Sequence, residues 1–290
     1  MTETILIIGG TGNIGFPLIK LLAQGDQIHL VAGAHDLAKD QAQYGRLPVD
    51  LRHFDFLDAG TFDQTLAGVD RVFFVRPPQL AKPKADMLPF LNQVKTHHVK
   101  QTVFVSMIGV EKNPVTPHHK IENMIVALGL PHTFIRPSFF MQNLSTTHRE
   151  DICLRNDLFI PAGSAKTSFI DTADIAAVAA KVLTSPAVPE QKLNITGPEA
   201  ITYAQVAQTM SAILGRPITY SKPSLLKFRK TMLQRGVKKD FVNVMVMLYL
   251  ITQMGNAKQI TQDLPNYLGR PAHSVAEFIT ANQRLFAPAK

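Results

Sequence analysis

The first fifteen residues contain the pattern that most restricts how this chain can fold. An apolar run at 5–9 ends in a glycine-rich turn, and an apolar helical segment follows directly. Strand, glycine-rich turn and helix in this order are typical of the first unit of a dinucleotide-binding α/β fold. The turn fits G-x-G-x-x-G through Gly10, Gly12 and Gly15, and it fits G-x-x-G-x-x-G through Gly9, Gly12 and Gly15 equally well.

The residue types of this turn have a chemical reason. Glycines permit a tight turn, a close approach of the backbone to a pyrophosphate, and close packing of the helix on the strand. The free N–H groups and the positive dipole end of the helix N-terminus favour phosphates. The residues expected to contact a dinucleotide here are Gly9, Gly10, Thr11, Gly12, Asn13, Ile14 and Gly15.

Short apolar runs alternate with helical patterns through the first half of the chain. The runs at 28–33, 51–56, 71–75, 102–106 and 133–137 have the near-continuous apolar character of strands buried on both faces. Helical patterns separate them, and several end at a glycine suited to a C-terminal cap. This alternation predicts an α/β protein with a Rossmann-type doubly wound parallel sheet.

The rhythm changes after Phe139. A strand and an Ala-rich helix are expected within 168–184, a strand at 192–196, and further helices at 202–214 and 274–285. We therefore expect a dinucleotide-binding Rossmann domain formed by 1–140 and 166–198. The remaining segments, 141–165 and 199–290, would form a smaller C-terminal lobe.

The end of the second predicted strand bears on the choice of cofactor. An acidic residue there can bond the ribose 2′-OH of NAD, whereas a basic residue accommodates the 2′-phosphate of NADP. The chain offers His35 and Asp36 side by side, with Lys39 one helical turn beyond. The residues alone leave NAD and NADP open.

Two further strand ends lie where ligands collect in such folds. Asp55 and Phe56 follow the third strand and can border an adenine, although the Phe56 ring is equally suited to the core. The backbone at Val75 and Arg76 ends the fourth strand at the same edge of the sheet.

The net charge of +8 is a local property of one segment. Residues 1–221 contain equal numbers of basic and acidic side chains, whereas 222–239 contains seven basic side chains and no acidic one. The segment can be a solvated helical face, an anion-binding lip, or a surface for a protein partner or a second copy. Nucleic acid is a disfavoured partner, because Phe228 is the one aromatic residue available there for stacking.

Composition also excludes several classes of protein. A single cysteine, Cys153, cannot form an internal disulfide, and the N-terminus has no basic residue before its apolar run, as a secretion signal would. The apolar stretch at 241–251 is far shorter than the roughly 18 residues of a membrane-spanning helix. We expect a cytoplasmic protein with a small-molecule substrate and no membrane partner.

Seven motifs together resemble the NmrA-like group of atypical short-chain dehydrogenases/reductases. The resemblance covers nearly the whole chain and implies a Rossmann-type domain, a smaller C-terminal lobe and a substrate cleft between them. The family includes NAD(P)H-dependent reductases, bacterial type-2 quinone oxidoreductases, and NAD(P)-sensing regulators without catalysis. The motifs are IIGGTGNIG (7–15), FDFLD (54–58), LAGVDRVFFV (66–75), VFVSMIGV (103–110), LPHTFIRPSFFMQN (130–143), FIDTADIAAVAAKVL (169–183) and LNITGPEAITYAQVA (193–207).

The resemblance favours NADP slightly, with one departure. An Arg commonly follows the second strand in NADP-preferring members, and His35 stands at that position here. The resemblance also implies that Phe139, Met141 and Asn143 border the substrate. Packing between lobes explains the Phe and the Met as well, whereas Asn143, a polar side chain among apolar neighbours, needs a partner.

The proton relay of the wider short-chain dehydrogenase family is missing. No Tyr-x-x-x-Lys sequence occurs anywhere in the chain. Alignment on Glu122, the helix glutamate of the family, places His118 at the Lys position and Pro114 at the Tyr position, while Ser106 matches the family's serine. Ser106 and His118 are thus the candidate catalytic residues, His118 because an ordinary imidazole has a pKa near neutral.

Two functions from different classes follow. In the first, hydride passes directly from NAD(P)H to an acceptor such as a quinone, with His118 or water supplying protons. In the second, the protein binds NAD(P) and signals its redox state to a partner without turnover. Metal binding is disfavoured, because the paired histidines His97–His98 and His118–His119 are adjacent and diverge by about 100° on a helix. Arg136, after the sixth predicted strand, is expected to form a structural ion pair.

Overall fold

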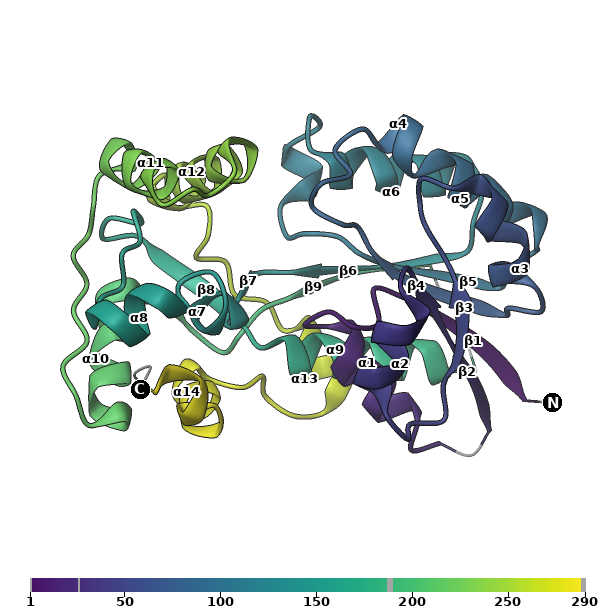
Figure 1. Ribbon diagram of the computed structural model, residues 1–290, viewed down its shortest axis with the longest axis horizontal. Helices are drawn as coiled ribbons and strands as arrows, with labels where there is room; N and C mark the ends of the chain where they lie inside the picture. The colour runs from purple at the N-terminus through teal and green to yellow at the C-terminus, as the bar shows by residue number, and fades with distance from the viewer. Residues whose placement is uncertain (1, 26, 187–189, 288–290) are drawn as a thin grey trace. The chain divides into compact units, whose positions relative to one another are not determined.

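The computed structural model describes residues 2–25, 27–186 and 190–287. These residues form two compact units, each with its own core. The first contains the described residues of 1–137, 172–195 and 266–269, and the second contains those of 138–171, 196–265 and 270–290. Figure 1 shows the order of the elements along the chain.

A seven-stranded sheet in which every pairing is parallel forms the centre of the first unit. Its strand order is β3-β2-β1-β4-β5-β6-β9, the doubly wound order extended by one strand. The Rossmann-type α/β fold predicted from the sequence is confirmed. The strands are β1 (Glu3–Ile8), β2 (Ile28–Ala34), β3 (Asp50–His53), β4 (Arg71–Val75), β5 (Gln101–Val105), β6 (His132–Pro137) and β9 (Gln191–Ile195).

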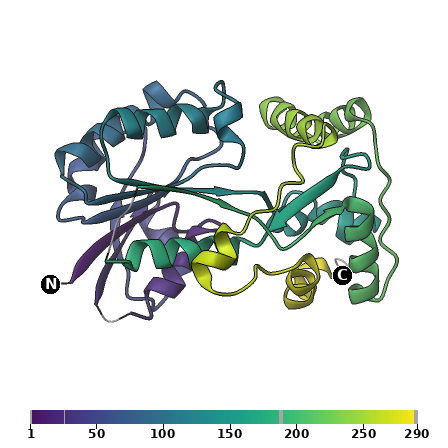
Figure 2. The same cartoon turned by 180° about the vertical axis from the view of Figure 1, so that it is seen from behind.

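Helices cover both faces of this sheet (Figure 1). On one face lie α3 (Phe62–Leu66), α4 (Pro83–Asp86), α5 (Leu88–Thr96) and α6 (Pro117–Ala127). On the other lie α1 (Gly15–Leu22), α2 (Leu37–Tyr44) and α9 (Thr172–Thr184), with α1 packed against α9 (Figure 2). Because helices flank the sheet on both sides, the inner strands β1, β4, β5 and β6 are buried along most of their length, whereas the edge strands β3 and β9 are more polar.

The third strand is shorter than the apolar run at 51–56 suggests. It ends at His53, and the chain then turns so that Phe54 and Phe56 enter the core beneath α3 and α5. Their rings meet edge to face, with centroids 4.8 Å apart, and both contact Phe90. Phe54 and Phe56, which the sequence pattern assigns to the strand, therefore pack with other aromatic rings in the core after the strand has ended.

The second unit is built on a small sheet with the order β10-β8-β7. Two of its helices begin with the capping boxes that the sequence predicts, at Thr202 and Ser274, and Gly215 ends the first of them in a left-handed conformation. The strands are β7 (Phe139–Phe140), β8 (Lys166–Ile170) and β10 (Ala200–Thr202). The helices are α7 (Gln142–Ser145), α8 (Arg149–Arg155), α10 (Tyr203–Leu214), α11 (Leu225–Gln234), α12 (Lys239–Gln253) and α14 (Val275–Ala281), while α13 (Asp263–Leu268) runs from this unit into the first.

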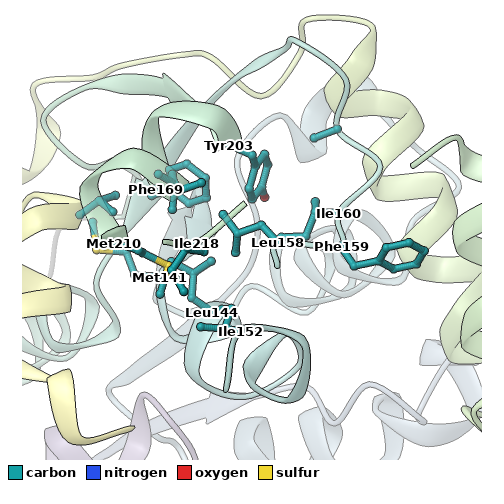
Figure 3. Close-up of a cluster of buried hydrophobic side chains, with 14 of the residues drawn as sticks. Met141, Leu144, Ile152, Leu158, Phe159, Ile160, Phe169, Tyr203, Met210 and Ile218 are labelled. Atoms are coloured by element: carbon teal, nitrogen blue, oxygen red, sulfur yellow. The ribbon is translucent and has the colours of Figure 1, made fainter. Parts of the chain in front are cut away.

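Apolar side chains from most of these elements meet in the core of the second unit (Figure 3). Met141, Phe169 and Tyr203 lie within it, each with an exposed fraction of 3% or less. The apolar stretch at 241–251 lies within α12. Among the described residues, no helix has the length and apolar character needed to cross a membrane.

The basic segment at 222–239 forms α11 and the connections on either side of it. Some of its charges serve the fold: Arg235 donates to the Asp151 carboxylate at 2.9 Å, and Lys222 donates to the Ser164 hydroxyl at 2.7 Å. Four others, Lys227, Lys230, Lys238 and Lys239, are exposed. A binding role for those four stays a prediction.

Candidate functional site

Three glycines of the turn after β1 are required by the fold itself. Gly9 has a φ of +86°, which favours glycine. A Cβ on Gly15 would collide with the carbonyl oxygen of Gly9, and one on Gly10 would lie 2.6 Å from Ile19 Cδ1. The turn is closed by a hydrogen bond from the Gly12 N–H to the Gly9 carbonyl at 3.1 Å.

Gly12 differs from the other three. Its φ is not left-handed, and a Cβ there would approach only the Gly9 oxygen, at 3.3 Å. The N–H groups of Asn13 and Ile14, just before α1, have no acceptor within the described chain. Since the fold gives little reason for a glycine at 12, the open backbone around it fits the pyrophosphate of a dinucleotide.

Two side chains of α2 brace this turn from the side. Gln43 Nε2 donates to the Thr11 carbonyl at 3.0 Å, and the Tyr44 hydroxyl lies against Gly10. Burial, and secondarily the charge of Asp40, raises the pKa of Tyr44 well above its usual value, so the phenol stays neutral. The sequence reasoning missed both residues. The signal that could have found α2 is Asp36 as an N-cap, with Gly45 just past the helix end.

The acidic and basic residues at the end of β2 differ in their contacts. The Asp36 carboxylate accepts the backbone N–H of Lys39 at 3.0 Å and so caps α2. His35 is largely exposed, with Nδ1 3.6 Å from the Asp55 carboxylate. The acidic side chain at this strand end is therefore engaged by the fold, and the basic ones, His35 and Lys39, are exposed.

The residues at the ends of β3 and β4 differ in their surroundings. The Phe56 ring is buried in the aromatic core, so a contact with a cofactor would have to come from its backbone. Val75, the last residue of β4, lies directly beside Gly9, with its Cβ 3.7 Å from the position of a Gly9 Cβ. The carboxyl end of β4 thus adjoins the turn expected to hold the cofactor.

Ser106 follows β5 at the same edge of the sheet. Its backbone N–H continues the ladder to the Ile135 carbonyl at 2.8 Å, and its side chain is 5% exposed. The hydroxyl has no hydrogen-bond partner in the part of the chain that the structure describes. Because buried hydroxyls are normally paired, this one is suited to a ligand.

His118 lies in the first turn of α6, where Thr116 caps the helix by accepting the His119 N–H at 3.3 Å. Its ring stacks on Phe104, with centroids 5.9 Å apart. Burial, followed by the positive charge of Arg76, lowers the pKa of His118 to about 4. The near-neutral pKa expected for His118 is therefore wrong: both effects disfavour the imidazolium, and at pH 7 the ring is neutral.

Arg136 on β6 has the structural role predicted for it. Its Nε donates to Glu122 on α6 at 2.9 Å, and Nη1 donates to Glu111 at 3.2 Å. Arg136 and Glu122 are both buried. The family's helix glutamate therefore serves here to pair a buried cation.

The residues expected to border a substrate belong to the second unit. Phe139 is half-buried on β7, and Met141 is fully buried in the core. Asn143 is half-buried in α7, and its carbonyl accepts the His148 N–H at 2.9 Å. Contact of these three side chains with a substrate stays a prediction.

Known proteins resemble this chain in sequence and in fold. A model of the NmrA-like family matches residues 1–268. An NAD(P)H azoreductase from Xenophilus azovorans is 32% identical over 293 residues, which cover 98% of this chain and 100% of that protein.

Two solved structures share the fold. The NADPH-dependent quinone oxidoreductase QOR2 from Escherichia coli, solved with NADPH, has a TM-score of 0.85 at 22% identity, covering 96% of this chain and 99% of that one. NmrA, a negative transcriptional regulator solved with NADP, has a TM-score of 0.78 at 15% identity, covering 97% and 96%.

Proposed function

The chain belongs to the NmrA-like family, and we propose that within it this protein is an NAD(P)H-dependent reductase that passes hydride to a small acceptor such as a quinone. The observation that carries the proposal is a set of polar groups without partners in the described chain, at the carboxyl edge of the central sheet of the first unit. There the open backbone at Gly12 and the unpaired hydroxyl of Ser106 follow β1 and β5 of one sheet. Ligands of doubly wound sheets bind at this edge.

NADP(H) is the preferred cofactor in this proposal. The Asp36 carboxylate already accepts the Lys39 N–H through Oδ1 as the N-cap of α2, which leaves Oδ2 for the 2′-OH of NAD. His35 and Lys39 are the exposed basic groups nearby, and they suit a 2′-phosphate. The relatives point the same way, since QOR2 and NmrA were solved with NADPH and NADP.

The chain's own residues have three tasks in this mechanism. The turn at 9–15 binds the pyrophosphate, and when bound the cofactor supplies the hydride. The Ser106 hydroxyl donates a hydrogen bond to the acceptor. His118, being neutral, places no second positive charge beside Arg76. Water supplies the proton that completes reduction, since no Tyr-x-x-x-Lys relay occurs in the chain.

Turnover of the wild-type protein tests the proposal. Purified protein is mixed with NADPH or NADH and a panel of quinones and azo dyes, and cofactor oxidation is followed by absorbance. We expect oxidation well above the uncatalysed rate with at least one acceptor, faster with NADPH. Calorimetric binding of NADPH without turnover on any acceptor would contradict the proposed activity.

A redox sensor is the second candidate, supported by the likeness to the regulator NmrA and by the missing relay. It requires the protein to distinguish NADP⁺ from NADPH, because a ligand can shift a conformational equilibrium only by its differential affinity. Titration of both forms by calorimetry tests this. Equal dissociation constants would remove the sensor function.

A further inference from the structure

Arg76 is a half-buried cation for which the described chain provides no carboxylate partner. Its Nη1 donates to three carbonyls of the loop that follows, those of Pro77, Pro78 and Leu80, at 2.8, 3.1 and 2.9 Å. Its Nε is buried and has no partner among the described residues. The loop thus holds the guanidinium in place without neutralising its charge.

The nearest acid does not compensate this charge directly. Asp86 acts on Arg76 through its field, but its carboxylate accepts the Lys82 N–H at 2.8 Å. Burial lowers the pKa of the Arg76 guanidinium, yet an arginine stays charged in proteins. A desolvated cation without a counter-ion costs free energy, and a negatively charged ligand would offset that cost.

The sheet places Arg76 next to Ser106. Val75 and Val105 are paired in register across β4 and β5, and parallel neighbours lie about 4.8 Å apart. Phe74 and Phe104 lie two residues before Arg76 and Ser106. Their rings stack with centroids 4.8 Å apart, so these two side chains lie on the same face of the sheet. Arg76 and Ser106 follow these two strands at the edge of the sheet where ligands bind.

Together these groups provide a cation and an unpaired hydroxyl after two neighbouring strands, with a neutral imidazole within the field of the cation. Hydrogen bonds from charged donors to anionic oxygen are short and strong, and they gain strength away from water. We propose that Arg76 and Ser106 form a binding site for a negatively charged oxygen of the acceptor. This inference rests on the proposed reductase function and narrows its substrate class.

The negative oxygen has two possible sources. An acidic substituent of the acceptor, such as a sulfonate or carboxylate, carries it permanently. Alternatively, it arises during the reaction: a quinone that accepts hydride takes up two electrons and one proton and becomes the hydroquinone monoanion, while NADPH is left as NADP⁺. Water then protonates the monoanion to the hydroquinone and leaves hydroxide.

Arg76→Met tests the site with two acceptors, naphthoquinone and naphthoquinone sulfonate. If the substituent binds Arg76, we expect KM for the sulfonate to rise about tenfold or more, with the neutral quinone changed less than about twofold. If the charge develops during hydride transfer, kcat should fall about tenfold or more for both acceptors at nearly constant KM. Arg76→Lys should restore part of either loss.

Controls separate this site from a role in the loop or in cofactor binding. Lys95→Met removes one exposed charge from α5 of the same unit and should leave both acceptors unchanged. A loss in Arg76→Met that is matched by an equal loss of NADPH affinity in calorimetry would overturn the proposal. So would unchanged kinetics with both acceptors.

Failure of the reductase function itself gives a different pattern. If the wild-type protein oxidises no NADPH, binding of the redox-inert naphthalene sulfonate to the NADP⁺-loaded protein is compared between wild type and Arg76→Met. Binding that weakens about tenfold or more in the variant supports the anionic site without the reductase function. Equal binding, or none to either protein, overturns it.

Discussion

Arg76 directly follows β4 and Arg136 lies on β6, the two strands that flank β5, yet their surroundings are opposite. Arg136 is buried with carboxylates from Glu122 and Glu111 against it. Arg76 has three carbonyls against one nitrogen and, in the described chain, no carboxylate. At the end of β6, carboxylates of the protein pair the buried cation. At the ends of β4 and β5, the Arg76 cation and the Ser106 hydroxyl have no such partner within the described chain, and we call this region the unfinished part of the edge. We propose that the unfinished part is the place for a ligand.

Substitutions at the two arginine sites should have the largest and most unequal effects on the free energy of unfolding. Glu122→Gln removes the charge that Arg136 faces, and we expect the free energy of unfolding to fall by about 3 kcal/mol or more. Arg76→Met removes a cation that has no counter-ion, and we expect a change below about 1 kcal/mol. Urea unfolding of both variants measures the contrast, and equal losses would show that Arg76 is structural as well.

Two glycines of the turn after β1 should also differ in how much their substitution lowers the free energy of unfolding. Gly15→Ala puts a methyl group into the Gly9 carbonyl and should cost about 1–3 kcal/mol of stability together with cofactor binding. Gly12→Ala meets only the Gly9 oxygen at 3.3 Å, so its stability should change by less than about 1 kcal/mol.

NADPH affinity should nevertheless fall about tenfold or more in Gly12→Ala, because the methyl group occupies the side left open for the pyrophosphate. Thermal unfolding and calorimetric titration on the same samples compare the two variants. A Gly12→Ala protein that binds NADPH normally would place the pyrophosphate elsewhere.

Much of the fold, and the position of this edge within it, was predictable from the sequence. Most of the central strands are near-continuous apolar runs, Gly9 to Gly15 follow a local pattern, and Ser106 is placed by the end of a strand. The unfinished part was less visible. The pKa of His118 is lowered by burial and then by Arg76, 42 residues earlier, and the bracing of Gly10 by Tyr44 depends on a helix without a strong apolar pattern. The periodicity of a single sequence does not reveal contacts between segments that are far apart along the chain.

The pH dependence of stability gives the smallest expected effect. The folded-state pKa of His118 is about 4, below its unfolded value near 6.5, so the unfolded state binds more protons between these pH values. This stabilisation is complete above pH 6.5 and is lost as pH falls toward 4. His148, whose pKa burial also lowers to about 4, acts in the same window.

Unfolding free energies measured from pH 7 to 4 test this expectation. His118→Gln should reduce the slope by up to about 1.4 kcal/mol per pH unit, and His98→Asn, a change at an exposed site, should leave it unchanged. An unaltered slope in His118→Gln would mean that the ring is not held neutral.

The central claim, that the unfinished edge is a reaction site, is tested most directly by two hydroxyls on one strand. Ser106 and Thr102 are both buried, and neither hydroxyl has a partner among the described residues, but Ser106 follows the carboxyl end of β5 and Thr102 lies near its amino end. The measurement is kcat/KM for NADPH oxidation with naphthoquinone in wild type, Ser106→Ala and Thr102→Val. We predict a loss of about tenfold or more in Ser106→Ala and less than about twofold in Thr102→Val. Equal rates in the two variants would contradict the assignment of the site.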